Sequence, residues 1–417
     1  MRQLVFGITF FLLFTVVSFA QSYKRLHKRA LVVDTHNDVI STVSMRGLKL
    51  DSDLRGKTHS DVDRLKEGGV DVQVFAIFCD ERFGKDTAFK YANIEIDSLY
   101  AVVQRNPGKL VIAHNTADIA RAVKAGKIAC MMGVEGGHMI EDKLANLDAL
   151  YNRGVRYLTL TWNNSTSWAS SAKDETEAPS GSPGGGVNRT LGQLDEAAAN
   201  NTVGSQSRPG AAGGPSHREG SGMGLTAFGK QVVKRMNELG MLVDVSHVGE
   251  QTFWDAIATT TKPLIASHSC AYALCGHRRN LKDDQIKAIG KNGGVVHLNF
   301  NAGFVDSTFD RKMSRLSVLH KKEIDSLAAL KWTDYEIEDH LVAKYKNEVD
   351  AIRPPLSMLL DHLDHIVRLV GVNHVGLGSD YDGSIIPPLG LDNVTQLPNI
   401  TKALWAVATA ERRSAKY

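Results

Sequence analysis

Short apolar runs rich in β-branched residues recur along the chain, and amphipathic stretches of helix length separate most of them. Eight runs have the length and composition of buried strands. They begin at Leu31, Val72, Ile128, Arg156, Met241, Pro263, Gly294 and His374. Between them, stretches such as 225–240 and 358–371 place apolar residues three and four positions apart and end in Gly. The pattern predicts strands and helices in alternation.

This alternation predicts an α/β protein built on a parallel sheet. Eight strand–helix repeats favour a closed (β/α)8 TIM-like barrel over an open, doubly wound sheet. A flavodoxin-like or Rossmann sheet is the alternative, but no Gly-x-Gly-x-x-Gly turn follows the first strand, which weighs against dinucleotide binding. We therefore expect residues 21–417 to form a single domain.

The first 20 residues have the layout of a signal peptide. Arg2 precedes an apolar run, and the small residues Ser18 and Ala20 stand where cleavage requires them. We therefore expect an exported protein, periplasmic or secreted. The alternative is an uncleaved anchor helix, although the run is short for a span of about 20 residues. Association with a membrane surface is expected only in that case.

Residues 177–222 interrupt the alternation of strands and helices. This segment is rich in Gly, Ser, Pro, Ala and Asn and has little apolar content, which predicts a flexible insertion. Because it follows the fourth strand, it would lie over the rim of the barrel where the strands end. Long loops at that rim can act as lids, but the sequence favours a segment without a role, and the lid is the alternative.

Charge and cysteine content limit which partners and metal ligands the protein can have. The formal net charge is +3, with 49 basic against 46 acidic side chains, so the chain lacks the broad positive field of a nucleic-acid binder and a small-molecule partner is expected. Its four Cys are scattered and form no Cys-x-x-Cys motif. This spacing predicts neither a disulfide framework nor a cysteine zinc site, so a metal would have to be held by His and carboxylates.

Side chains with metal-binding chemistry follow five of the eight predicted strands. They are His36 and Asp38 after the first strand, Glu135 after the third, His247 after the fifth, His268 after the sixth and Asp380 after the eighth. All strand ends of a barrel converge on one rim, where distant residues meet. Imidazole and carboxylate together suit Zn²⁺ or a similar divalent ion. The sequence therefore predicts a metal site at the C-terminal rim.

Seven segments in this order resemble those of the membrane (renal) dipeptidases, in the amidohydrolase superfamily of metal-dependent barrels. They are VDTHND, GVEGGH, YLTLT, VDVSH, ASHS, HRRN and GLGSDYDG. The resemblance runs from about Leu31 to Ile400, apart from the insertion. It implies a metallo-dipeptidase that hydrolyses dipeptides, including those with a D-residue at the C-terminal position, and that can form a homodimer.

The resemblance also implies how the metals are held. Two Zn²⁺ per chain would be bridged by Glu135, with His36 and Asp38 completing one site and His247 and His268 the other. A hydroxide bridging the two ions would attack the peptide carbonyl, so no nucleophilic Ser or Cys is required.

Two further residues receive roles from the resemblance. Arg279 matches the arginine that pairs with the C-terminal carboxylate of the dipeptide, and its neighbour Arg278 is the less favoured choice. Asp380 matches the carboxylate that takes a proton from the bridging water and passes it to the leaving amine. Asp382 is the alternative, although a turn residue before Gly383 is its expected role.

The chain departs from the family pattern in three places. Trp162 stands where better-known members carry a histidine that contacts the substrate carbonyl, and an amide from Asn163 or Asn164 could replace that donor. His138, the other nearby imidazole, is expected to be structural. The family lacks the insertion, and the short tail from about 405 is atypical, so we expect a lower thermal midpoint than with a full-length tail.

Two other functions stay open from the sequence. A barrel with the same metals could act on another amide or a lactam, because fold and metal site do not set substrate specificity. The chain could also be a metal-binding homologue whose activity the insertion and tail have impaired.

Overall fold

The computed structural model describes residues 23–80, 86–177 and 224–414. The predicted signal peptide lies outside these residues, as does the predicted insertion except for its first residue. Within the described residues, no helix is both long enough and apolar enough to cross a membrane.

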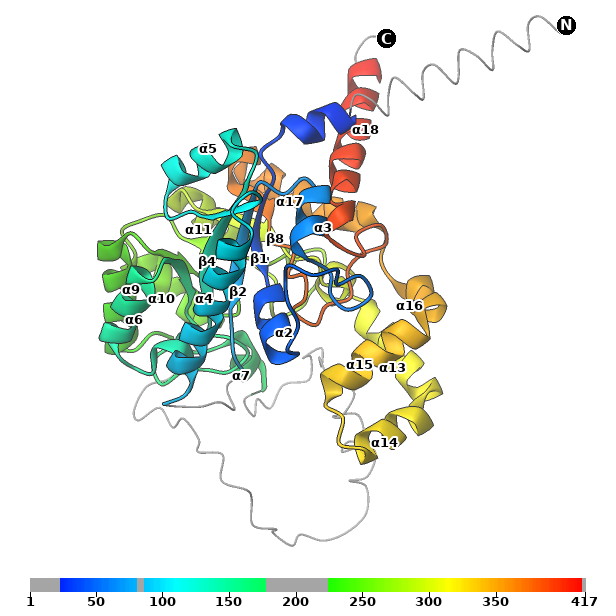
Figure 1. Cartoon of the computed structure of the whole chain (residues 1–417), viewed down its shortest axis with the longest axis horizontal. Coiled ribbons are helices and arrows are strands. Elements are labelled where there is room, and N and C mark those ends of the chain that lie inside the picture. Colours follow the sequence, from blue (N-terminus) through cyan, green and yellow to red (C-terminus); the bar gives the residue numbers. More distant parts are fainter. Residues whose placement is uncertain (1–22, 81–85, 178–223, 415–417) are drawn as a thin grey trace, which may run out of the picture.

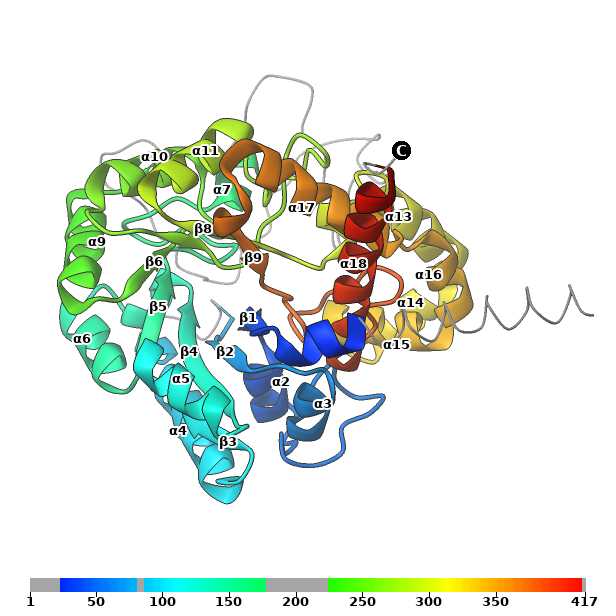
Figure 2. The same ribbon diagram turned by 90° about the horizontal axis from the view of Figure 1, so that it is seen from above.

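Eight parallel strands close into a barrel that helices surround (Figures 1 and 2). Around the barrel they follow in the order β2 (Val72–Ile77), β1 (Val33–Asn37), β9 (Val375–Leu377), β8 (Val295–Leu298), β7 (Ile265–Ala266), β6 (Leu242–Asp244), β5 (Val155–Thr159) and β4 (Ile128–Glu135). Pairing of β2 with β4 closes the circle. All eight predicted strands and the (β/α)8 barrel are thereby confirmed.

One strand was not predicted. β3 (Leu110–Ile112) pairs with the first half of β4. From Met132 onwards, β5 pairs with that same edge of β4. β2 is buried on both faces, since all six of its residues are buried. This follows from the architecture, because side chains fill the inside of the barrel while helices cover its outside.

The helices that follow the strands form the outer layer of the barrel (Figure 2). Their bounds are α2 Val39–Met45, α3 Val62–Glu67, α4 Ala88–Arg105, α5 Thr116–Lys124, α6 Leu144–Asn152, α7 Ala172–Glu177, α9 Ala227–Leu239, α10 Glu250–Thr259, α11 Asp283–Asn292, α12 Ala302–Val305, α17 Leu356–Val370 and α18 Pro398–Ser414. Short 3-10 turns lie at Gly137–Ile140, Val372–His374 and Val394–Gln396.

The two amphipathic stretches singled out in the sequence are both helices, α9 and α17. In α9 the Thr226 side chain caps the first turn by accepting from the Gly229 N–H, and Gly240 ends the helix with φ +75°. Its buried face carries Val232, Val233 and Met236. The capping residues at its two ends and the stripe of apolar residues along it therefore both favour a helix over this segment.

Four more helices stand to one side of the barrel between β8 and α17 (Figure 1). They are α13 Phe309–Leu319, α14 Lys321–Ala329, α15 Asp334–Lys344 and α16 Lys346–Ile352. Phe309, Leu316 and Val349 pack with Ile386 in a small apolar cluster of their own. The alternation of strands and helices gave no sign of this excursion.

All four cysteines are buried and free. Their spacing in the sequence predicted no disulfide framework.

Candidate metal centre

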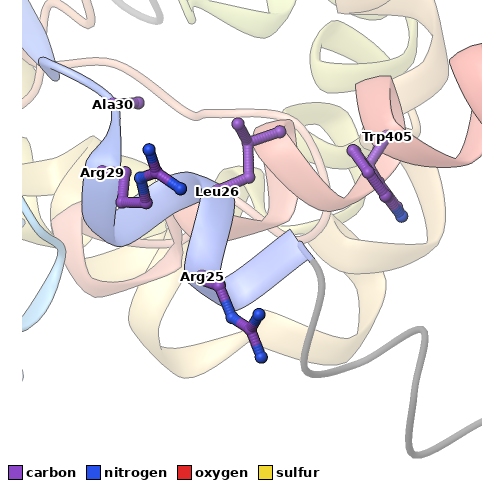
Figure 3. A pocket seen from close by; sticks show the side chains of 5 residues that line it. All are labelled: Arg25, Leu26, Arg29, Ala30 and Trp405. Atoms are coloured by element: carbon purple, nitrogen blue, oxygen red, sulfur yellow. The ribbon is translucent and has the colours of Figure 1, made fainter.

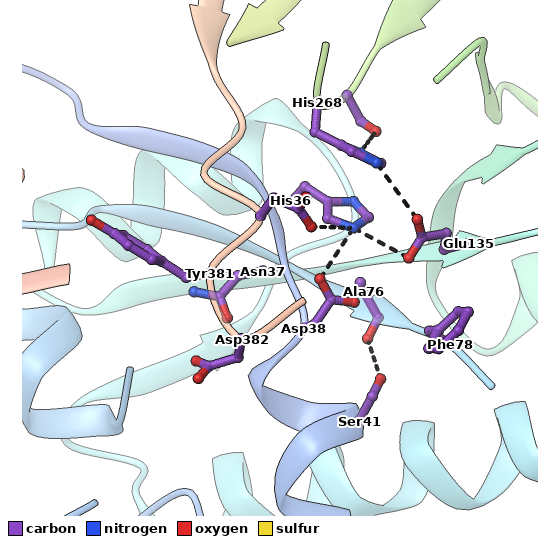
Figure 4. A network of polar contacts seen from close by, with 12 residues as sticks. His36, Asn37, Asp38, Ser41, Ala76, Phe78, Glu135, His268, Tyr381 and Asp382 are labelled. Atoms are coloured by element: carbon purple, nitrogen blue, oxygen red, sulfur yellow. Dashed lines mark hydrogen bonds and ion pairs between the residues drawn. The ribbon is translucent and has the colours of Figure 1, made fainter. Parts of the chain in front are cut away.

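The five residues predicted as metal ligands converge at the C-terminal rim of the barrel. Figure 4 shows four of them, His36, Asp38, Glu135 and His268. Their ligand atoms form two overlapping sets, each within 4.8 Å. One set is His36, Asp38 and Glu135, and the other is Glu135, His247 and His268. A third set joins His36 and His268 to Asp380. Strand ends far apart in sequence therefore bring together the donors that the sequence singled out.

Glu135, the last residue of β4, directs its two carboxylate oxygens at different imidazoles. Its Oε2 lies 3.4 Å from His36 Nε2. Its Oε1 lies 2.8 Å from His247 Nε2 and 3.5 Å from His268 Nε2. Burial disfavours the charge of this carboxylate, but His36 and His247 outweigh that effect and hold the pKa of Glu135 well below its ordinary value. Glu135 is thus the only residue that both ligand sets share.

His36, on β1, is held by a partner on β5, a strand that does not pair with β1. Its Nδ1 lies 2.8 Å from the hydroxyl of Tyr157, and that hydroxyl donates to the Thr35 carbonyl at 3.2 Å. The Tyr157 oxygen therefore accepts from His36, which assigns a proton to Nδ1 and turns Nε2 toward the centre. There Nε2 lies 3.4 Å from Asp38 Oδ2, and neither buried atom has a hydrogen-bond partner among the described residues.

The charge of His36 depends on its surroundings. Burial opposes a charge on the imidazole, but Tyr157, Glu135 and Asp38 outweigh it and raise the pKa of His36 well above its ordinary value. A ligating imidazole is neutral, so a cation bound here would displace a proton.

His268 is oriented in the same way from the other side of the barrel. Its Nδ1 lies 2.8 Å from the hydroxyl of Ser267, and this hydroxyl donates to Asp244 Oδ2 at 2.6 Å. The Ser267 oxygen therefore accepts from His268, and Nε2 faces Glu135. Asp244, the last residue of β6, is fully buried and also accepts from the Ser267 N–H at 2.8 Å.

His247 completes the second set in a strained backbone conformation, with φ +66°. Its Nε2 lies 3.0 Å from His268 Nε2. Burial, assisted by Arg279, lowers the pKa of His247 to about 4, so the imidazole is neutral. Burial and the charge of His36 likewise lower the pKa of His268. Two neutral imidazoles with nitrogens this close, both beside Glu135, form a donor set that fits a divalent cation.

Asp380 lies at the edge of the cluster, also with a positive φ of 62°. Its Oδ1 is 3.9 Å from His36 Nε2, and its Oδ2 accepts from Asn299 Nδ2 at 2.8 Å. Burial and the neighbouring Asp38 raise the pKa of Asp380 well above its ordinary value. Asp382 instead accepts from the His59 N–H at 2.6 Å, so of the two aspartates only Asp380 is joined to the ligand sets.

Arg279 lies in the loop after β7 and is 6% exposed. Its guanidinium stands 5.5 Å from the centre of the Phe304 ring, and its Nε has no hydrogen-bond partner among the described residues. Burial lowers the pKa of Arg279 to about 10, opposed by Asp380 and Glu135, so the side chain is a cation near neutral pH. A buried guanidinium with an unpaired donor is suited to an anionic ligand.

The model of the membrane dipeptidase family (peptidase family M19) matches residues 20–193 and 199–414. The chain belongs to this family. An uncharacterized dipeptidase of Schizosaccharomyces pombe is 30% identical over 396 residues, which cover 91% of this chain and 76% of that protein. Membership in the M19 family makes the protein a metallo-dipeptidase, a hydrolase that uses metal ions.

Solved structures share the fold of this M19 dipeptidase. The probable dipeptidase PvdM from Pseudomonas aeruginosa has a TM-score of 0.69 at 24% identity, covering 93% of this chain and 92% of that one. A metallo peptidase from Rhodobacter sphaeroides, liganded with a phosphinate mimic of the dipeptide L-Ala-D-Ala, has a TM-score of 0.64 at 23% identity and covers 90% and 92%.

Three polar residues around the M19 metal centre were missed in the sequence. Tyr157 and Asp244 lie inside apolar strand segments, and Asn299 directly follows β8. Asp244 carried a signal, because a carboxylate within an apolar strand is costly to bury without partners. Asn299 stands at a strand end like the predicted ligands, but an amide is not an ordinary zinc ligand.

A cavity of about 550 Å³ lies elsewhere (Figure 3). It is lined by Arg25, Leu26, Arg29, Ala30 and Trp405, between the helical residues 23–29 and α18. Because residues 23–29 precede β1, this cavity belongs to the end of the barrel opposite the metal centre. It contributes no residue to the ligand sets.

Proposed function

We propose that this enzyme hydrolyses dipeptides with two zinc ions. His36, Asp38 and Glu135 would hold one ion, and Glu135, His247 and His268 the other. The observation that carries the proposal is the position of Glu135, whose two oxygens face separate sets of imidazoles. The unpaired buried atoms His36 Nε2 and Asp38 Oδ2 support it, because a cation would satisfy both.

The ions, when bound, would lower the pKa of a water molecule and polarise the peptide carbonyl. The chain supplies the proton transfers and the binding of substrate. Asp380 is close enough to the ligand sets to accept a proton and return it to the leaving amine, and Asn299 fixes its carboxylate. Arg279 would pair with the C-terminal carboxylate of the dipeptide. No Ser or Cys nucleophile takes part.

Dipeptides with a D-residue at the C-terminal position are included in the proposal. The Rhodobacter sphaeroides metallo peptidase with the same fold binds a phosphinate mimic of L-Ala-D-Ala, which supports testing such substrates here.

Export of the protein is also proposed, because the first 20 residues have the layout of a signal peptide. N-terminal sequencing of the protein recovered outside the cytoplasm would show whether they are removed.

The experiment is reconstitution of the purified chain with Zn²⁺, followed by a panel of L-L and L-D dipeptides. Free amino acids should be released, and a chelator should abolish the release. Hydrolysis of amides or lactams without dipeptide cleavage would select that other substrate class. Two bound ions without any turnover would select an impaired metal-binding homologue.

Glu135→Gln tests the bridging role directly. Loss of one anionic oxygen should reduce both the metal content and the rate, because one side chain serves two ions. Glu238→Gln, on the exposed side of α9, is the matched control and should change neither. A Glu135→Gln enzyme with two tightly bound ions and full activity would contradict the assignment.

Arg279→Lys tests the binding of the substrate carboxylate. It should mainly raise KM, since Lys cannot form the bidentate contact that Arg makes with a carboxylate.

A further inference from the structure

We infer that Phe78 and Trp162 form an aromatic wall that receives the side chain of the N-terminal residue of the dipeptide. The enzyme should therefore prefer dipeptides that begin with a bulky apolar or aromatic residue. This inference rests on the proposed function and narrows its substrate class.

The wall stands beside the metal centre. Phe78 directly follows β2, and Trp162 lies just beyond the end of β5. Their ring centroids are 4.8 Å apart with planes tilted by 51°, and the Trp162 ring is 6.5 Å from the ring of His247. Both side chains are only partly buried. Two large apolar rings in contact, partly exposed at a polar rim, are typical of a surface that binds an apolar ligand group.

Buried polar contacts hold the wall in place from behind. The Phe78 N–H donates to Glu95 Oε2 at 2.8 Å, and Glu95 is completely buried. The ring nitrogen Nε2 of His138 lies 2.9 Å from the Cys79 carbonyl, which ties the end of β2 to the turn after Glu135. The expected structural role of His138 agrees with this contact. These contacts fix the backbone that carries Phe78 before any substrate binds, which reduces the entropy cost of binding.

The turn after Glu135 leaves room for the wall at Gly136. A Cβ on Gly136 would lie 2.4 Å from the His138 ring and 3.3 Å from the Trp162 Cβ, and φ is +98° there. Only glycine combines this backbone conformation with these two neighbours. The bridging carboxylate and the wall are thus parts of one packed unit.

The order of strands indicates which end of the dipeptide meets the wall. Arg279 belongs to the loop after β7, and Phe78 to the end of β2. Three strands separate β7 from β2 in either direction around the barrel, so the two residues lie on opposite sides of the rim. A dipeptide whose carboxylate pairs with Arg279 and whose peptide bond lies over the ligand sets extends its N-terminal residue toward β2 and β5.

The test compares kcat/KM for Phe-Ala, Ala-Phe and Ala-Ala with the zinc-loaded full chain. The unaltered enzyme should favour Phe-Ala over Ala-Ala by about tenfold or more, from the apolar area that the wall buries. Trp162→Ala and Phe78→Ala should each reduce kcat/KM for Phe-Ala by about tenfold and that for Ala-Ala by less than about threefold. Trp332→Ala removes an exposed indole on the helical excursion and should change none of the rates.

Each other result overturns a defined part of the inference. Equal losses on Phe-Ala and Ala-Ala would show that the rings only support the fold. A preference for Ala-Phe that the substitutions abolish would place the C-terminal residue on the wall. No dipeptide hydrolysis by the unaltered enzyme would refute the proposed function itself, and the wall assignment with it. If an Ala variant melts early, Trp162→Leu and Phe78→Leu decide by the same ratio, since they keep apolar bulk.

Discussion

Gly383 lies against the carboxylate of Asp380 so closely that a Cβ on Gly383 would stand 2.4 Å from Asp380 Oδ1. The same Cβ would be 2.6 Å from Asp38 Oδ2. Its φ lies outside the left-handed region, so the obstacle is contact and not backbone strain. Gly383 therefore gives the two acidic residues of the centre room to adopt their positions.

Gly383→Ala should displace one or both of these carboxylates. We expect kcat/KM to fall by about 10- to 100-fold, because displacements of about 1 Å at a catalytic group have effects of this size. The matched control is Gly108→Ala, where a Cβ would meet nothing within 4 Å. Steady-state kinetics on one dipeptide, with metal content measured in parallel, checks the prediction. Equal rates for both variants would mean that the carboxylates can shift without consequence.

Asn299 should set the pH at which Asp380 becomes active as a base. Its Nδ2 donates to Asp380 Oδ2 at 2.8 Å, and a donor to a carboxylate favours the charged form. In Asn299→Ala the pKa of Asp380 should rise, so the acid limb of the kcat/KM profile should move to higher pH by about one unit.

Asn299→Asp provides the graded comparison. It keeps the oxygen that accepts from the Asn301 N–H and replaces the donor with a second carboxylate. Like charges should raise the pKa of Asp380 further than Ala does. The pH profile of kcat/KM for both variants tests the order, and an unmoved acid limb in both would remove Asp380 from the role of base.

The sequence predicted the barrel and the meeting of the five candidate ligands because both follow from repetition. Each buried strand shows as an apolar run, and each ligand stands where a run ends. β3 was not predicted because it stands outside the eightfold repeat: it is a short strand that pairs only with β4 and takes no place in the barrel. The excursion α13–α16 was missed because its helices carry ordinary amphipathic patterns, and nothing in such a pattern tells whether a helix packs on the barrel.

Residues that orient the ligands were harder to predict than the ligands themselves. Tyr157 has the composition of a core strand residue, and only the fold shows that its hydroxyl meets His36. The position of Trp162 was noted in the sequence, but its contact with Phe78 joins two strand ends 84 residues apart and required the structure. The period of apolar residues along one segment does not show which distant strand ends lie beside each other in the fold.

Tyr157 should strengthen metal binding through His36. Tyr157→Phe removes the oxygen that accepts from His36 Nδ1, so the imidazole loses its fixed orientation. We expect zinc affinity to fall by about 10- to 100-fold, the usual effect of losing such a partner. Titration against a competing chelator measures this without any substrate. The control is Tyr100→Phe on α4, whose hydroxyl donates to the Arg153 carbonyl at the surface, and affinities that match between the two would argue against the role.

Glu95 should make the stability of the fold depend on pH. Burial raises the pKa of Glu95 well above its ordinary value of 4.5, and the contacts from Phe78 and Ser41 only partly oppose this. Its contribution to the free energy of unfolding is therefore fully present below pH 4.5 and is lost as the pH rises through the folded pKa.

Glu95→Gln removes this titration and keeps an oxygen for the Phe78 N–H. The thermal midpoint of the variant relative to the unaltered protein should therefore rise from pH 5 to pH 8. Melting curves at several pH values, recorded with zinc present throughout so that occupancy of the metal centre stays constant, measure the difference. A difference that stays level or falls over this range would mean that Glu95 is ionised in the fold at little cost, and that its carboxylate is stabilised by more than its two hydrogen bonds.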